Sequence, residues 1–222
     1  MVAVAVCFKN EEEVLPFTIP TWKLFADQIV YLDTGSTDSS LDLAIESARL
    51  CDVVRQVPWK DFSTAINQSM DLAQERWAIR MDADELLVGN PEEFAKWLEW
   101  IDSDPKHQEV APSILLALYE FHDEKWVLVN WRARMFVWSN GWKFRFPIDP
   151  QPVPPEGVPY GLLCPETLCR VYHLRESTRE ESLIRNECYV WKRILEDEPL
   201  SDEEIAHYEV VLETCNLGRE EP

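Results

Sequence analysis

The sequence is poor in basic residues. It has 21 lysines and arginines against 41 aspartates and glutamates, which gives a formal charge of -20 at pH 7. A surface of this charge repels nucleic-acid phosphates and anionic lipid headgroups alike. We therefore expect no nucleic-acid partner. A divalent cation would still allow an acidic pocket to bind a phosphorylated ligand.

The sequence also lacks a long apolar run and a recognisable cysteine pattern. The apolar stretch at residues 2–8 is too short to span a membrane and is followed by charged residues, so we expect a buried strand and not a signal peptide. The six cysteines show neither the paired spacing of a zinc site nor the density of a disulfide scaffold. We expect the cysteines to be free thiols, and the protein to be cytoplasmic and without a transmembrane segment.

The length and composition fit one domain, because 222 residues with 46% hydrophobic content can bury a sizeable core. In the first half, short apolar runs alternate with amphipathic stretches, which is typical of βα units around a mostly parallel sheet. Strands are predicted at residues 2–8, 28–33, 52–57 and 77–81, with helices at 11–25, 41–50 and 62–75. We expect the first helix to be broken by its two prolines.

The second half has a different character. A short helix is predicted at residues 91–101, followed by two antiparallel strands at 113–121 and 125–138. The seven prolines between residues 147 and 165 predict an extended loop. A strand at 167–174 and helices from residue 177 onward complete the expected fold.

Two carboxylates, Asp82 and Asp84, follow the predicted strand at 77–81. If the backbone stays extended there, both side chains point to the same side, at the sheet edge where open α/β folds bind ligands. Mn²⁺ or Mg²⁺ would accept such oxygens and bridge them to a diphosphate, whose departure it would assist as a Lewis acid. For the tripeptide taken alone, a solvated acidic turn is the alternative.

Several blocks in the first 90 residues occur in an order that resembles family 2 glycosyltransferases. The similarity is closest to the branch that acts in lipopolysaccharide-core synthesis. A virus-encoded enzyme, or one module of a larger polypeptide, is a further expectation. The blocks are Lys9-Asn10-Glu11-Glu12, Asp33-Thr34-Gly35-Ser36-Thr37-Asp38, Trp59-Lys60-Asp61-Phe62 with Asn67, and Met81-Asp82-Ala83-Asp84-Glu85.

The resemblance implies a GT-A fold and transfer of a hexose, with inversion, from a nucleotide sugar. We expect a UDP-sugar such as UDP-glucose as donor, with Mn²⁺ or Mg²⁺, and a glycan or glycolipid hydroxyl as acceptor. Residues 1–90 would form the nucleotide-sugar half of a single domain, and residues 91–222 the acceptor half.

The resemblance also implies roles for individual residues. Asn67 and Arg80 would contact the sugar or the diphosphate, although either could be a structural tie. Asp33 would bind the base or ribose, with a turn-capping role as its alternative. The residues expected around the nucleotide are Cys7, Phe8, Lys9, Asn10, Glu11, Asp33, Asn67, Arg80 and Asp82.

Two residues of the second half complete the expected site. By analogy with GT-A enzymes, His173 would join Asp82 and Asp84 at the metal; a structural role is the alternative for a lone histidine at the end of a strand. Inversion needs a general base for the acceptor hydroxyl, and Asp149 is the first candidate because of its place after a short apolar run. The alternatives for the base are Glu120, Glu156 and Glu166.

Two other functions compete with glycosyl transfer. A nucleotidyltransferase shares the sheet and acidic metal site but usually has a Gly-rich, basic loop after its first strand, where this sequence has Lys9-Asn10-Glu11-Glu12-Glu13. A sugar- or nucleotide-binding module without a catalytic base is the non-enzymatic alternative.

Overall fold

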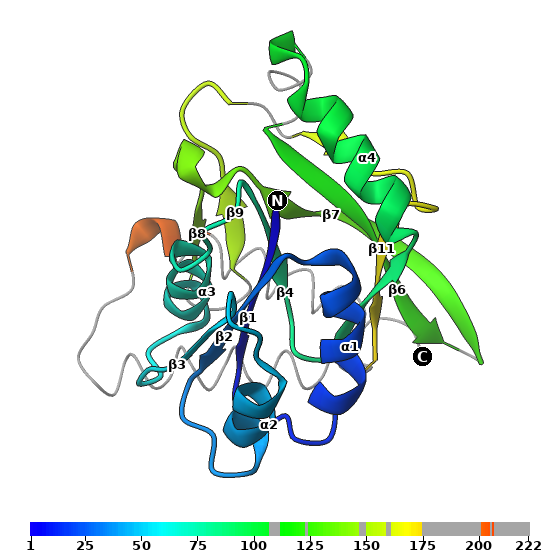
Figure 1. Ribbon diagram of the computed structural model, residues 1–222. Helices are drawn as coiled ribbons and strands as arrows, with labels where there is room; N and C mark the ends of the chain where they lie inside the picture. Colours follow the sequence, from blue (N-terminus) through cyan, green and yellow to red (C-terminus); the bar gives the residue numbers. More distant parts are fainter. Residues whose placement is uncertain are drawn as a thin grey trace, which may run out of the picture.

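The structure is a computed structural model that describes residues 1–106, 112–122, 124–146, 150–158, 161–174, 201–204 and 206. Its centre is a large curled sheet with helices packed on both faces (Figure 1). The expectation of an α/β fold with a mostly parallel central sheet is therefore confirmed. The predicted C-terminal helices lie outside the described residues, apart from the short stretch at 201–204.

The first half of the chain forms the parallel part of the sheet. Its strands are β1 (Val2–Phe8), β2 (Gln28–Asp33), β3 (Val53–Gln56) and β4 (Trp77–Met81). They lie in the order β3-β2-β1-β4, with Val4 of β1 opposite both Ile29 of β2 and Ile79 of β4. These central strands are apolar along almost their whole length, because both of their faces are covered.

Among the described residues, four α-helices cover the sheet: α1 (Leu15–Phe25), α2 (Ser40–Ser47), α3 (Phe62–Asp71) and α4 (Pro91–Asp102). Apolar residues of α1, α2 and α4 join one core cluster, and those of α3 join a second cluster on the other side of the sheet. Asp61 caps α3 by accepting a hydrogen bond from the Thr64 N–H, and Asn90 caps α4 in the same way.

The break expected in the first helix is absent. The helix α1 is continuous, with Pro16 in its first turn and Pro20 inside it. A proline in the first turn sacrifices no intrahelical bond. The missing bond at Pro20 is offset by burial of Ile19 and Trp22, since tertiary packing supplies most of the stability of a helix.

The rest of the chain, from residue 85 onward, extends the sheet with antiparallel and parallel pairs. Its strands are β5 (Glu85–Gly89), β6 (Ser113–His122), β7 (Lys125–Phe136), β8 (Lys143–Arg145), β9 (Gln151–Val153), β10 (Leu162–Leu163) and β11 (Cys169–His173). In the described part the main sheet has nine strands, in the order β3-β2-β1-β4-β7-β6-β11-β5 with β10 beside β6. The sequence did not predict β5. The segment expected to be an extended loop at 147–165 contains the short strands β9 and β10.

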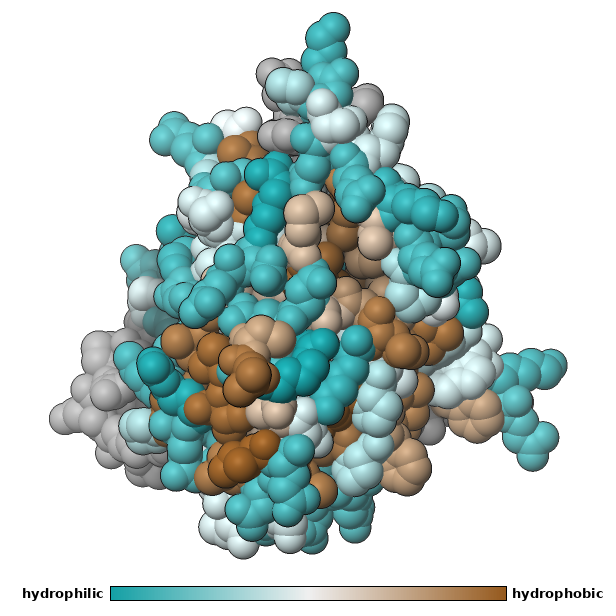
Figure 2. Space-filling view, in the orientation of Figure 1, coloured by the Kyte–Doolittle hydropathy of each residue, from teal (hydrophilic) through white to brown (hydrophobic). Residues whose placement is uncertain are grey.

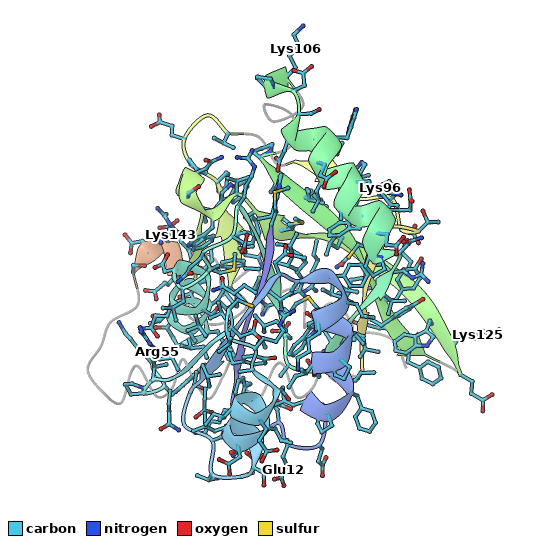
Figure 3. The ribbon with its side chains drawn as sticks, in the orientation of Figure 1. Glu12, Arg55, Lys96, Lys106, Lys125 and Lys143 are labelled. Carbon is cyan, nitrogen blue, oxygen red and sulfur yellow. The ribbon has the colours of Figure 1, made fainter. Side chains whose placement is uncertain are left out.

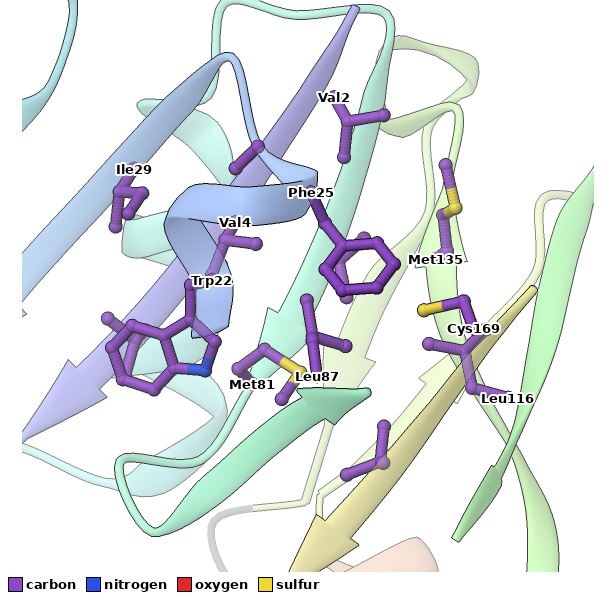
Figure 4. Packing of buried hydrophobic residues seen from close by; sticks show 14 of the residues in the cluster. Val2, Val4, Trp22, Phe25, Ile29, Met81, Leu87, Leu116, Met135 and Cys169 are labelled. Atoms are coloured by element: carbon purple, nitrogen blue, oxygen red, sulfur yellow. The ribbon is translucent and has the colours of Figure 1, made fainter. Parts of the chain in front are cut away.

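The larger core cluster lies between the sheet and helices α1 and α4. Figure 4 shows Trp22 and Phe25 of α1 facing side chains of the sheet, among them Met81 and Leu87. The rings of Phe25 and Phe94 meet edge to face, with centroids 5.8 Å apart. Burying one such large side chain contributes about 1.5–3 kcal/mol, so these contacts stabilise the packing of α1 against α4 and the sheet.

Charged side chains lie at the periphery, as Figure 3 shows for Lys96 on α4, Lys143 on β8 and Lys125 at the tip of the β6–β7 hairpin. Apolar side chains also reach the surface, and Figure 2 shows apolar surface over α1 and α2, where Phe17 and Ile45 are exposed. Among the described residues, no helix is both long and apolar enough to cross a membrane.

Candidate functional site

Three loops meet at one edge of the sheet, because β2, β1 and β4 are neighbours and run parallel. Their carboxyl ends therefore lie side by side, and the loops that follow them contain Asn10, the turn at 34–38 and Asp82. Ligands of open α/β sheets bind at this edge. The fold thus assembles residues that the sequence separates by dozens of positions.

The loops after β1 and β2 are joined by hydrogen bonds. Asn10 Oδ1 accepts from the Thr37 N–H at 2.8 Å, and the Asn10 N–H donates to Ser36 Oγ at 3.0 Å. Asn10 has a φ of 57°, a left-handed conformation that asparagine tolerates better than most residues. The next residue, Glu11, donates its N–H to Ser40 Oγ at 2.7 Å. The two loops therefore form one rigid rim.

Asp33, at the end of β2, is fully buried and holds the turn that follows it. Its Oδ1 accepts from the Ser36 N–H at 3.0 Å, and its Oδ2 accepts from Gln56 Nε2 at 2.6 Å. This is the turn-capping role that the sequence left open. A contact with the base or ribose stays a prediction.

Asp82 and Asp84 belong to a turn, so the extended backbone that would point both side chains to the same side is not present. The Glu85 N–H donates to the Asp82 carbonyl at 3.1 Å, which closes the turn and turns the two carboxylates to different partners. Asp82 Oδ2 accepts from Arg80 NH1 at 2.7 Å and lies 3.5 Å from Arg134 NH1. Asp82 is thus held by two guanidinium groups.

Asp84 faces His173 instead. His173 Nε2 lies 3.2 Å from Asp84 Oδ2, and the N–H of Leu174 donates to the backbone carbonyl of Asp84 at 2.8 Å. On the other side of the ring, Nδ1 lies 4.0 Å from Glu120 Oε1. Burial lowers the pKa of His173. The hydrogen bond to Asp84 and the charges of Asp84, Asp82 and Glu120 outweigh it, so the pKa is raised.

The spacing of this pair fits a divalent cation. Two adjacent ligands of an octahedral ion with bonds of about 2.1 Å lie about 3 Å apart, close to the separation of His173 Nε2 and Asp84 Oδ2. In the described part of the chain, no three His, Cys, Asp or Glu side chains are arranged to hold an ion. The remaining ligands of a bound ion would have to come from a substrate or from water.

Sequence reasoning assigned no role to Glu85 and Arg134, which belong to this site. They are only 1% and 3% exposed, and Arg134 NH2 donates to Glu85 Oε1. For Arg134 the available signal was its place directly before the apolar residues Met135 and Phe136, with which it is buried.

Residues at the end of β1 surround the same edge. Cys7 lies near Arg80 and Asp82, and burial raises the pKa of its thiol to about 11. The carbonyl of Phe8 accepts hydrogen bonds from both the N–H and the hydroxyl of Thr34, whereas Lys9 is exposed. Cys7 and Phe8 are therefore close to the acidic turn, and their nucleotide contacts stay predictions.

Of the other residues predicted for the site, some make structural contacts and one lies outside the described residues. The Asn67 amide donates to the Phe144 carbonyl and accepts from the Phe144 N–H, both at 2.8 Å, which ties α3 to β8. Asp149 lies outside the described residues. Among the alternative bases, Glu120 stands beside His173, and Glu166 accepts a hydrogen bond from the Tyr119 hydroxyl.

Solved structures share this fold. TarS from S. aureus, in complex with UDP-GlcNAc, superposes with a TM-score of 0.56 at 12% identity, over 79% of this chain and 59% of that chain. The mannosyltransferase PcManGT from Pyrobaculum calidifontis gives a TM-score of 0.56 at 14% identity, over 90% of this chain and 65% of that chain. These similarities confirm the expected GT-A type of fold.

Sequence comparison identifies the family. A TPR repeat-containing protein from Synechococcus elongatus is 36% identical over 92 residues, which is 40% of this chain and 22% of that protein. The chain thus spans less than a quarter of that relative. The family model described as "Glycosyl transferase family 2" matches residues 3–152, more than half of the chain. The chain therefore belongs to glycosyl transferase family 2.

Proposed function

We propose that this chain is a metal-dependent inverting glycosyltransferase that transfers a hexose from a nucleotide sugar to a hydroxyl of a glycan or glycolipid. A UDP-sugar such as UDP-glucose is the proposed donor. The observation that carries the proposal is the pair formed by Asp84 and His173, at the edge where the loops after β1, β2 and β4 meet.

In this proposal, Asp84 and His173 hold Mn²⁺ or Mg²⁺ through Oδ2 and Nε2. A bound ion would supply Lewis-acid stabilisation to the diphosphate that leaves. Asp82 has a different role from Asp84, because Arg80 and Arg134 already occupy its oxygens. We assign it to orienting the ribose or a metal-bound water, with Arg80 placed to balance the charge of the donor.

The rim formed by the Asn10 loop and the turn after Asp33 would bind the nucleoside. Backbone groups near residues 7–11 can pair with the edge of a base, and a carboxylate such as Asp33 can accept from a base N–H or a ribose hydroxyl. The rigidity of this rim favours the proposal, because less conformational freedom is lost when a nucleotide binds.

Inversion requires a group that removes the proton of the acceptor hydroxyl as the sugar is displaced. Asp149 remains the proposed base. Glu120 is the alternative with a structural argument, since its carboxylate lies 4.0 Å from His173 Nδ1 and therefore beside the proposed metal site.

The bound molecules of the two similar structures are consistent with this proposal. TarS was solved with UDP-GlcNAc, and PcManGT with GDP-Man and Mn²⁺. Both share the fold at low sequence identity, so they support a nucleotide sugar in general. The lipopolysaccharide-core branch, a viral or multidomain origin and a cytoplasmic location also remain predictions.

The proposal is tested with Mn²⁺ and a panel of UDP- and GDP-sugars, measuring binding and slow donor hydrolysis. We expect one donor to bind with Mn²⁺ present, and Asp84→Ala to abolish this binding. Asp71→Ala is the matched control, because Asp71 is exposed and its carboxylate contacts Trp138 and Lys143, which lie outside the proposed site. No donor binding by the wild type, or equal binding by Asp84→Ala, would refute the proposal.

Two further assays separate the competing functions. Release of diphosphate from a nucleoside triphosphate and a sugar phosphate would identify a nucleotidyltransferase. Donor binding without transfer to any glycan or glycolipid in a broad acceptor screen would favour the non-catalytic binding module.

A further inference from the structure

Glu85 and Arg134 form a buried ion pair from two strands that are far apart in sequence. Glu85 is the first residue of β5, and Arg134 lies near the end of β7; they are 1% and 3% exposed. Removing two charges from water costs several kcal/mol per ion, and an apolar pair of similar volume is often equally stable. General stability is therefore a weak explanation for this pair.

Glu85 holds the acidic turn at three points. Its Oε2 accepts from the Asp82 N–H at 2.8 Å, and its own N–H donates to the Asp82 carbonyl at 3.1 Å. Its carbonyl accepts from the indole N–H of Trp22 at 2.8 Å, and Trp22 is completely buried in the core. The turn is thereby closed on itself and anchored to α1.

Arg134 connects this anchored glutamate to the turn. One guanidinium nitrogen donates to Glu85 Oε1, and another lies 3.5 Å from Asp82 Oδ2. The position of Arg134 is set by the pairing of the next residues of β7 with β4, where Met135 lies opposite Ile79. The guanidinium therefore binds two carboxylates that flank Asp84 in sequence.

Asp84 is the residue that the turn presents. Its carboxylate faces His173, and its backbone carbonyl accepts from the Leu174 N–H at 2.8 Å. The direction of the Asp84 side chain depends on the shape of a turn whose backbone is bonded to the side chain of Glu85. A change of about 1 Å at such a turn is enough to spoil ligand geometry.

We propose that Glu85 and Arg134 are positioning residues, which hold the 82–84 turn so that Asp84 and His173 stand at metal-binding distance. This inference rests on the proposed function, because it needs Asp84 and His173 to be the metal ligands. Outer residues that orient metal ligands typically contribute about 10–100-fold to metal affinity. Glu85 and Arg134 should have an effect of this size without touching the ion.

The test measures binding of Mn²⁺ alone, by the electron paramagnetic resonance signal of the free ion, in the full chain. Glu85→Gln keeps an oxygen that can accept from the Asp82 N–H but removes the charge that pairs with Arg134. Arg134→Lys keeps the charge and removes the two-pronged contact. We expect each to weaken Mn²⁺ binding by about 10–100-fold, while circular dichroism shows a folded protein at the assay temperature.

Matched controls make the same changes at exposed ion pairs. Glu93→Gln on α4 and Arg145→Lys on β8 alter side chains that are 52% and 56% exposed, and we expect Mn²⁺ binding as in the wild type. If Glu85→Gln does not fold, Mn²⁺ binding by Arg134→Lys decides the question. If neither variant folds, the pair is required for the fold and the inference is overturned.

Asp84→Asn separates the two possible failures. If the wild type binds Mn²⁺, Asp84→Asn does not, and both positioning variants bind within about threefold of the wild type, then only the positioning role is overturned. If the wild type itself binds no Mn²⁺, or Asp84→Asn binds it equally well, the proposed function fails and the positioning role with it.

Discussion

His173 Nε2 lies 3.2 Å from Asp84 Oδ2, although the two residues come from opposite halves of the chain. The contact exists because β11 pairs antiparallel with β5, which places His173 opposite Glu85, the residue after Asp84. Each half of the chain therefore contributes one member of the proposed metal-binding pair.

This pair should make the stability of the metal-free protein depend on pH. The pKa of His173 is raised, because the hydrogen bond to Asp84 and nearby carboxylates outweigh the effect of burial. The folded state thus binds the proton more tightly than the unfolded state. The stabilisation is complete below about pH 6.5, the unfolded-state pKa, and is lost as the pH rises through the higher folded-state pKa.

Thermal unfolding of the wild type and His173→Gln in EDTA, from about pH 5 to pH 9, measures this effect. We expect the wild type to be more stable at low pH and the difference in Tm to shrink as the pH rises. A difference of 1 kcal/mol corresponds to about 2–4 °C in a chain of this size. A Tm difference that stays constant, or grows with pH, would contradict the prediction.

Asn67→Ala should destabilise the protein and leave donor binding unchanged. The substitution leaves the buried backbone N–H and carbonyl of Phe144 without their partner, at a cost of about 1–3 kcal/mol. Urea unfolding measures the loss of stability, and the KM for the donor measures the site. A rise in KM at full stability would instead support the sugar or diphosphate contact implied by family resemblance.

Gly161→Ala should be more damaging than Gly157→Ala. A Cβ at Gly161 would lie 1.6 Å from the backbone oxygen of Ser113, so the β10–β6 pairing would have to shift, at a cost of about 1–3 kcal/mol or more. At Gly157 the new Cβ meets nothing, and only its φ of 77° opposes alanine, at about 1 kcal/mol. Chemical denaturation of both variants tests the order; equal losses would refute it.

Cys7 should resist alkylation in the folded protein. Burial raises the pKa of its thiol to about 11, so little of the reactive thiolate is present at about pH 8. Cys51 is exposed and provides an internal comparison. Iodoacetamide labelling followed by peptide mass spectrometry should modify Cys51 first and Cys7 only after denaturation. Labelling of both at similar rates would show that the thiol of Cys7 is accessible and ionised.

Most of the parallel half could be predicted from local sequence. The strands at Val2–Phe8, Gln28–Asp33 and Trp77–Met81 were predicted with their observed bounds, because continuous apolar runs bounded by turn residues are a local signal. The short strand Glu85–Gly89 was missed. Its pairing partner is β11, far away in sequence, and its first residue, Glu85, continues the acidic run that begins at Asp82.

The sequence by itself determined the fold class, the family and the edge of the sheet where Asp82 and Asp84 lie, because these depend on local patterns and on the order of blocks along the chain. Only the tertiary structure decided that Asp82 faces two arginines while Asp84 faces His173. The reason is physical. The turn in the backbone points the two carboxylates in different directions, and strand pairings between distant segments bring Arg134 to Asp82 and His173 to Asp84.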